Sequence, residues 1–241
     1  MDTSTRKNLF LLAIIFIVSN PVYAYFPKHW YIAGFLGKSN NASGDTKIPS
    51  IASRPPLTSE PVYQTGNTFE FGFGNQVISN FRIEGMMSYQ DLPMNKINNA
   101  IGQGTVTYVN DSYTRLFSFF ANAYYDFNSD PAWVVHPYIG LGGGYVNIKN
   151  MIRPASPIPV APGIFFTKKE LNYATFGYQG IFGITYPLSK NFLLDLNYKY
   201  FATLKKETTG FTNLGSDQYQ TSQKISDNMI SLGVRYYFNP L

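Results

Sequence analysis

Apolar and polar residues alternate repeatedly along the chain between Thr68 and Phe238. In the segment 66–74, for example, Phe69, Phe71 and Phe73 alternate with small or polar residues. A period of two places successive side chains on opposite faces of a β-strand. A soluble sandwich would bury the aromatic face, whereas a transmembrane barrel turns it toward lipid and keeps polar groups inside.

About eight such segments follow one another, near residues 30–37, 66–74, 81–90, 113–127, 133–146, 175–187, 192–201 and 227–238. Their connections alternate between short ones, near 75–80, 128–132 and 188–191, and long ones, near 38–65, 91–112, 147–174 and 202–226. Short periplasmic turns and long external loops are typical of outer-membrane barrels. The pattern therefore predicts an all-β fold, an eight-stranded antiparallel up-and-down transmembrane β-barrel, with a soluble sandwich as the structural alternative.

One choice of parity places the aromatic residues in two belts. With the N-terminus in the periplasm, one belt contains Trp30, Phe81, Tyr125, Tyr186, Phe192, Tyr236 and Phe238, and the other contains Tyr89, Tyr113, Tyr145, Phe176 and Tyr200. Aromatic belts at both membrane interfaces are typical of transmembrane barrels. The composition agrees, because aromatic residues make up 17% of the chain and charged residues only 14%.

The first 24 residues have the features of a secretory signal peptide. Arg6 and Lys7 precede an apolar run over 9–18, and Val22-Tyr23-Ala24 supplies small residues at a cleavage site. We expect cleavage after Ala24 and a barrel domain over residues 25–241. The chain has no cysteine, so disulfides and thiolate metal sites are excluded. A formal charge of +5 is too mild to suggest nucleic acid as a partner.

The opposite parity places a polar network inside the barrel. The predicted interior residues are Glu70, Arg82, Glu84, Asn122, Gln179, Asp195, Asn197, Lys199 and Arg235. An eight-stranded barrel is just wide enough for side chains to fill it, and buried charges need partners. The economical interpretation is a core of ion pairs that plugs the lumen. A narrow gated conductance, in which those pairs rearrange, is the alternative.

Catalytic and metal-binding residues are sparse. Only two histidines are present, His29 and His136, and neither lies in a motif with a nearby serine and acid on one strand face. We therefore expect no catalytic residues, no cofactor and no metal site, and a non-enzymatic protein. A site made only of carboxylates from the long loops remains open.

Several segments together resemble the eight-stranded outer-membrane family that includes the opacity-type surface antigens and the OmpA transmembrane domain. They are Trp30-Tyr31-Ile32-Ala33-Gly34, the run 122–127, the glycine-rich run 137–145, Tyr178-Gln179 with Gly183, the run 196–201, and the ending Gly233-Val234-Arg235-Tyr236-Tyr237-Phe238. The resemblance implies a cell outer-membrane location and folding by the assembly machinery that reads the last strand, although Asn239-Pro240-Leu241 follow the terminal aromatic here. It also implies roles as varied as adhesion, envelope stabilisation and complement resistance.

The long loops are the natural place for binding on a rigid scaffold. Their candidate contact residues are Lys149, Arg153, Lys168, Lys169, Lys205 and Lys206, with Lys224 nearby. Positive charge there suits outer-membrane lipids, the phosphates of lipopolysaccharide or host-surface polyanions, although plain solvated loops would have the same composition. The leading hypothesis is a non-enzymatic, opacity-like surface barrel. A small channel and, less favoured, a lipid-modifying enzyme are the alternatives.

Overall fold

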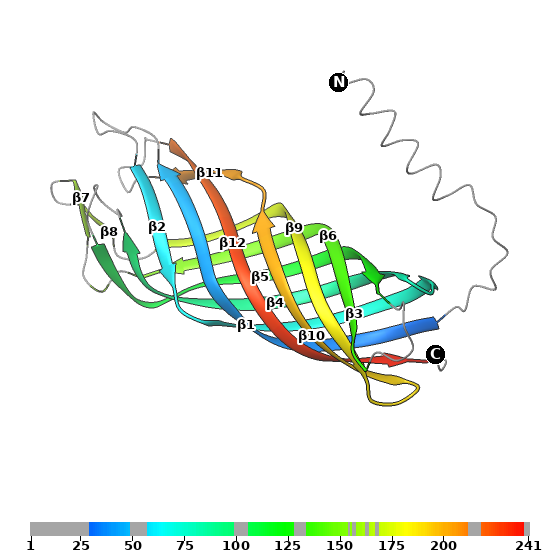
Figure 1. Ribbon diagram of the computed structural model, residues 1–241. Coiled ribbons are helices and arrows are strands. Elements are labelled where there is room, and N and C mark those ends of the chain that lie inside the picture. Colours follow the sequence, from blue (N-terminus) through cyan, green and yellow to red (C-terminus); the bar gives the residue numbers. More distant parts are fainter. Residues whose placement is uncertain are drawn as a thin grey trace, which may run out of the picture.

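The computed structural model describes residues 29–48, 57–98, 106–127, 134–153, 155, 158–161, 164–166, 169–211 and 218–238 (Figure 1). The predicted signal peptide and Lys168 lie outside these ranges. The division into a signal peptide and a barrel domain therefore stays a prediction.

Eight long strands form a closed antiparallel ring (Figure 1). In ring order they are β1 (His29–Ile48), β3 (Gly66–Ile78), β4 (Phe81–Asn98), β5 (Val106–Asp126), β6 (His136–Ile152), β9 (Lys169–Pro187), β10 (Phe192–Thr203) and β12 (Gln218–Tyr237). The last strand pairs with the first, and the amide of Phe238 donates to the carbonyl of Trp30 (3.0 Å) at the periplasmic end. The predicted eight-stranded antiparallel barrel is confirmed.

Four shorter strands lie at the end of the barrel away from the C-terminus (Figure 1). Strand β2 (Leu57–Tyr63) lies between β1 and β4, and β11 (Lys206–Phe211) pairs with β12. Strands β7 (Ile158–Ala161) and β8 (Ile164–Phe166) form a separate two-stranded ribbon. This end is the extracellular one in the predicted topology, and we call it the extracellular extension.

The ring strands are longer than a membrane requires. Transmembrane strands need about 9–11 residues, whereas the ring strands have between 12 and 21. The prediction of long loops over 38–65, 91–112, 147–174 and 202–226 is therefore wrong in extent, because much of each segment is strand. In the described ranges, no helix is long and apolar enough to cross a membrane.

The outward faces of the ring strands follow the predicted parity. Every member of the two predicted aromatic belts is exposed or half-buried. Neighbouring members also contact one another, as in the pair Phe192 and Tyr236, whose ring centroids are 4.8 Å apart. Pro137, which cannot donate to a ladder, is the second residue of β6 and so lies at the periplasmic end of its strand.

Candidate functional site

All nine predicted interior residues are buried within the barrel. Their exposed fractions run from 0% for Asp195 to 7% for Glu70. Side chains that a water molecule cannot reach do not line an open pore. The lumen is closed at the level of these residues, and how it is closed depends on their partners.

The pair of Arg235 and Asp195 joins β12 to β10. Two guanidinium nitrogens of Arg235 donate to the two carboxylate oxygens, at 3.0 Å from Nε and 2.6 Å from Nη2. The hydroxyl of Thr185 on β9 donates to the same carboxylate (2.5 Å). This bidentate geometry is the strong form of an ion pair and compensates the cost of burying both charges.

Arg82 has a different partner from those the sequence suggested. Its Nε donates to both carboxylate oxygens of Asp126, each at 3.2 Å. Its guanidinium lies 3.8 Å from the ring centre of Tyr124 and 4.7 Å from that of Tyr138, which adds cation–π attraction. The interior prediction missed Asp126, although this residue shares the inward parity of Asn122 on β5 and parity alone would have found it.

Two further acidic residues lie higher in the interior. Lys199 donates to Glu70 at 2.5 Å and bridges β10 to β3. Glu84 has neutral donors, the hydroxyl of Tyr124 at 2.7 Å and the amide of Asn122 at 3.3 Å, and Asn122 in turn accepts from Gln179 at 2.7 Å. These contacts connect five ring strands, so the interior network reinforces barrel closure.

The inward glycines of β6 make room for this network. A Cβ on Gly140 would lie 2.5 Å from the ring of Tyr124, and one on Gly142 would lie 2.0 Å from the amide oxygen of Asn122. These glycines therefore accommodate large inward side chains. The particular neighbours are Tyr124 and Asn122, while Tyr138 packs against Gly183.

The interior changes character in the extracellular extension. From the level of Leu116 upward, buried apolar residues such as Leu92, Ile148 and Ile225 lie beside buried neutral polar ones such as Ser112, Thr114, Asn150 and Gln223. The apolar cluster is continuous with membrane-level residues such as Phe35, Met86 and Phe120. Met94, Ile97 and Val109 form a separate apolar cluster farther out.

The outward faces change character at the same height. Paired residues on five neighbouring strands form a continuous row of polar side chains: Lys38, Asn67, Asp91, Arg115 and Lys149. We call it the charged row. The register partners one step closer to the periplasm are Leu36, Phe69, Tyr89 and Phe117, all exposed and apolar. The charged row thus marks where the lipid-facing surface ends.

Several of the candidate contact residues are already paired. The ammonium of Lys149 bonds to Glu170 (2.9 Å), and this hydrogen bond raises the pKa of Lys149. Arg153 lies 3.7 Å from the carboxylate of Asp111. Lys169 begins β9, and its side chain is outside the described part.

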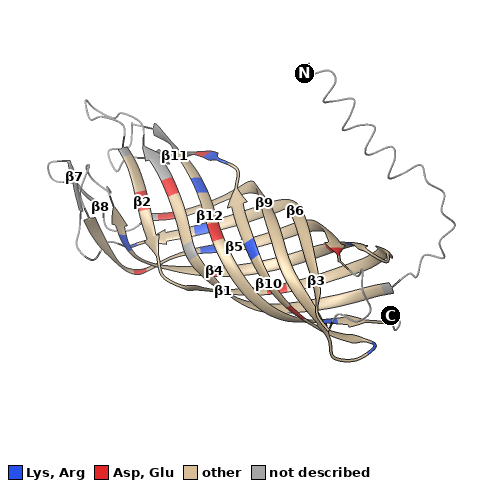
Figure 2. Ribbon diagram, in the orientation of Figure 1, with Lys and Arg blue, Asp and Glu red and all other residues tan. Residues whose placement is uncertain are grey.

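Other basic residues lie on β11, on β12 and beside β10. Lys205 lies in the two-residue connection between β10 and β11, and Lys206 begins β11. Lys206 is paired in register with Gln223, so it lies on the opposite face of the β11–β12 pair from Lys224, which is paired with Asp45 on β1. All three lysines are exposed. Figure 2 shows charged residues of both signs on β11 and β12 at this end. Among the described residues, none of the three lysines forms an ion pair.

No metal or catalytic cluster stands out in the described part of the chain. No group of three or more His, Asp and Glu side chains there is placed to hold a metal ion. His136 begins β6 at the periplasmic end and is half-buried. The side chain of His29 is outside the described residues.

Comparison with known proteins agrees with this architecture. Residues 9–238 match the family described as outer membrane protein beta-barrel domain. The chain belongs to this family of outer-membrane β-barrels, which places it in the cell outer membrane. No curated protein matches it in sequence.

Solved structures show the same fold at low sequence identity. The chain is similar to OprG from Pseudomonas aeruginosa, with 15% identity, a TM-score of 0.60, and coverage of 89% of this chain and 97% of that one. It is also similar to AlkL in lipid bilayers, with 16% identity, a TM-score of 0.50, and coverage of 92% and 95%. Neisserial surface protein A gives 18% identity, a TM-score of 0.43, and coverage of 86% and 96%.

Proposed function

We propose that this protein is a non-enzymatic surface barrel that uses its extracellular extension as a rigid binding platform. The observation that carries the proposal is the packed interior at both levels. Buried ion pairs and aromatic rings fill the membrane level, and apolar and neutral polar side chains fill the extension. Because both levels are packed, the outer surface of the extension is left as the place for contact with partners.

The three exposed lysines around β11 are the preferred contact for a polyanion. Lys205, Lys206 and Lys224 are exposed, whereas Lys149 and Arg153 each face a carboxylate. A cation that forms no ion pair attracts a sulfate or phosphate more strongly than one that is already paired. We infer that host-surface polyanions or lipopolysaccharide sugars carrying phosphate bind at these lysines.

The binding test compares two sets of variants of equal charge change. Lys205→Gln, Lys206→Gln and Lys224→Gln together should weaken binding of the folded protein to heparin-like chains at least fivefold. Lys149→Gln with Arg153→Gln should change it less than twofold. Equal effects of the two sets, or no binding by the unmodified protein, would contradict the proposal.

A closed lumen is the other half of the proposal. Planar-bilayer recording of the folded protein should show no discrete conductance, because Arg82, Lys199 and Asp195 are shielded from water. Regular single-channel steps that change size in Lys199→Gln would instead establish a channel. Lipid A that is chemically altered only when the protein is present would establish an enzyme, which the fold by itself does not exclude.

The closing strand suggests how the barrel is assembled. Strand β12 carries aromatic side chains at its periplasmic end, and Phe238 bonds to β1 through its backbone. We infer that this strand is the one that the outer-membrane assembly machinery reads. A Phe238→Ala variant should accumulate in the periplasm in place of the membrane.

A further inference from the structure

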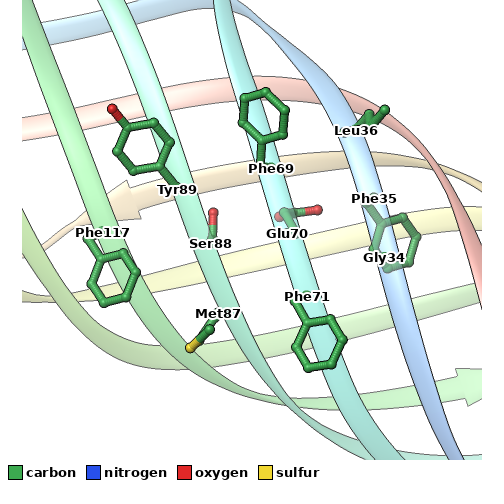
Figure 3. A pocket seen from close by; sticks show the side chains of 10 residues that line it. All are labelled: Gly34, Phe35, Leu36, Phe69, Glu70, Phe71, Met87, Ser88, Tyr89 and Phe117. Atoms are coloured by element: carbon green, nitrogen blue, oxygen red, sulfur yellow. The ribbon is translucent and has the colours of Figure 1, made fainter.

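The lipid-facing wall of the barrel is hollowed beneath the charged row. A depression of about 420 Å³ lies over β1, β3 and β4 and reaches Phe117 on β5. Figure 3 shows the rings of Phe69, Phe71, Tyr89 and Phe117 standing around it. It is an apolar hollow on the part of the surface that faces hydrocarbon.

A glycine is among the residues that line the hollow. Gly34 faces outward on β1, where the neighbouring outward residues of the strand are Ile32 and Leu36. A Cβ built on Gly34 would meet no atom within 4 Å, so its missing side chain leaves free space beside Phe71, its register partner. A lipid-facing position normally carries a large apolar side chain. The space at Gly34 is therefore available to an acyl chain.

Basic side chains lie directly above the hollow. Lys38 follows Leu36 on the outward face of β1, and Arg115 precedes Phe117 on β5. Lys38 donates to a neutral partner, Asn67 Oδ1 (2.6 Å), so its charge is not neutralised by that contact. Asp91 engages Arg115 through Nε (3.0 Å). The other guanidinium nitrogens of Arg115 can donate hydrogen bonds to a second anion.

The spacing of the two cations limits the kind of ligand. Lys38 and Arg115 occupy strands three positions apart in the ring, which corresponds to about 14 Å between their backbones at ~4.8 Å per strand; their side chains reach toward each other, to Asn67 on β3 and Asp91 on β4. A disaccharide with a phosphate at each end spans such a distance better than a single phosphate group does. Acyl chains attached to that disaccharide would descend into the hollow.

We propose that this wall is a binding site for the lipid A part of lipopolysaccharide. Its phosphates bind at Lys38 and Arg115, and one of its acyl chains occupies the hollow beside Gly34. The site goes beyond the proposed function, because it lies on β1, β3, β4 and β5, whereas the three lysines lie on β11, on β12 and beside β10. Its role is to anchor the barrel among particular lipids of the outer leaflet.

The experiment measures lipid binding to the folded protein in detergent micelles. The protein is titrated with lipid A, and the bound lipid is counted by native mass spectrometry. Gly34→Leu, which fills the hollow, should weaken binding at least tenfold. The matched control is Gly180→Leu, because Gly180 is also an outward glycine with open space around it but lies on β9, away from Lys38 and Arg115. The control should stay within twofold of the unmodified protein.

The charge contribution is tested separately. Lys38→Gln with Arg115→Gln should weaken lipid A binding at least tenfold, while Lys190→Gln in the periplasmic turn leaves it unchanged. Lipid A without phosphates should bind weakly to the unmodified protein and lose little further affinity in the double variant. Heat-modifiable gel mobility confirms that every variant is folded.

Three results would overturn the proposal. They are equal effects of Gly34→Leu and Gly180→Leu, equal binding of lipid A with and without phosphates, and a dimer of this chain that Gly34→Leu dissociates. Heparin binding is measured in the same variants and should not change. Failure of the lipid site is thereby distinguished from failure of the proposed function.

Discussion

The interior of the barrel at the membrane level and the interior of the extracellular extension follow opposite rules. Between the aromatic belts the inside is ionic, as at Arg235 and Asp195, and the outside is apolar. Above the charged row, apolar side chains such as Leu92 and Met94 lie inside beside neutral polar ones such as Ser112 and Asn150, and the charges of the row lie on the outside. The same strands continue through both levels, although the alternation is broken at Asn110 and Asp111 on β5 and at Asn150 and Met151 on β6.

The solvent explains the inversion. Lipid surrounds the lower part, so polar groups there have to satisfy one another inside the barrel. Water surrounds the upper part, so the hydrophobic effect places apolar side chains inside, as in any soluble domain. The protein is therefore a membrane barrel and a soluble barrel built from one set of strands, and the two parts should respond differently to substitution.

The largest effect is expected in the ionic interior. Arg235→Ala leaves Asp195 buried without its cation, which costs about 3 to 5 kcal/mol of unfolding free energy. Urea unfolding of the barrel in lipid vesicles measures it. The double variant Arg235→Met with Asp195→Leu removes both charges and should lose much less. Equal losses of unfolding free energy in the two variants would show that the cost comes from the lost ion pair and not from the unpaired charge of Asp195.

The next effect concerns the apolar side chains inside the extension. Leu92→Ala removes a side chain that is 0% exposed, and a cavity of this kind costs about 2 to 4 kcal/mol. We expect limited proteolysis to cut the extension faster while the membrane part stays resistant and heat-modifiable. Uniform loss of both parts would mean that the two interiors unfold as one unit.

A third prediction locates the boundary between the two parts on a single strand. Leu141 and Asn147 both face outward on β6. Leu141 lies well below the charged row, and Asn147 lies one outward position below Lys149. Leu141→Arg places a charge in hydrocarbon and should cost about 2 kcal/mol. Asn147→Arg lies near the headgroups and should cost little. Unfolding in vesicles compares the two, and equal costs would refute this placement of the membrane.

The smallest effect is a pH dependence of the extension. Burial of the Tyr63 hydroxyl, which bonds to Thr114 at 3.1 Å, raises the pKa of Tyr63 to about 12. Because an unfolded tyrosine ionises near pH 10, the folded form holds its proton more firmly between pH 10 and 12. The stabilisation that results is present in full below pH 10. As the pH rises to 12, the folding equilibrium constant falls by up to about tenfold per pH unit. Comparing the pH dependence of proteolysis in the unmodified protein and in Tyr63→Phe isolates the part due to Tyr63. The dependence should be weaker in the variant, where burial still raises the pKa of Tyr173.

The sequence predicted the membrane part well because its signal is local. Alternation at period two identified the ring strands and the outward side chains, and the same parity selected Glu70, Arg82 and Asp195 as interior residues. Turn chemistry correctly separated the strands at 188–191. None of these inferences needs to know which strand lies next to which.

The extension was missed for a physical reason. In segments such as 91–98 and 106–112 the apolar-out pattern ends. Leu92 and Met94 lie inside and Asp91 outside, and irregularities near Lys96 and Asp111 break the alternation. A search for strands with apolar residues on the outer face therefore assigns these segments to loops.

The sequence also did not reveal which interior charges pair with each other. Arg82 bonds to Asp126 and not to Glu84, because strand register and shear bring those side chains together only in the closed barrel.

The sequence alone thus determined the strands, their faces and the polar inventory of the interior, since each depends on neighbours a few residues away. Tertiary structure decided which charges pair, where the lipid-facing surface ends and where Gly34 leaves a hollow beneath Lys38. Those features depend on residues from different strands meeting at one height, and only closure of the ring fixes that height.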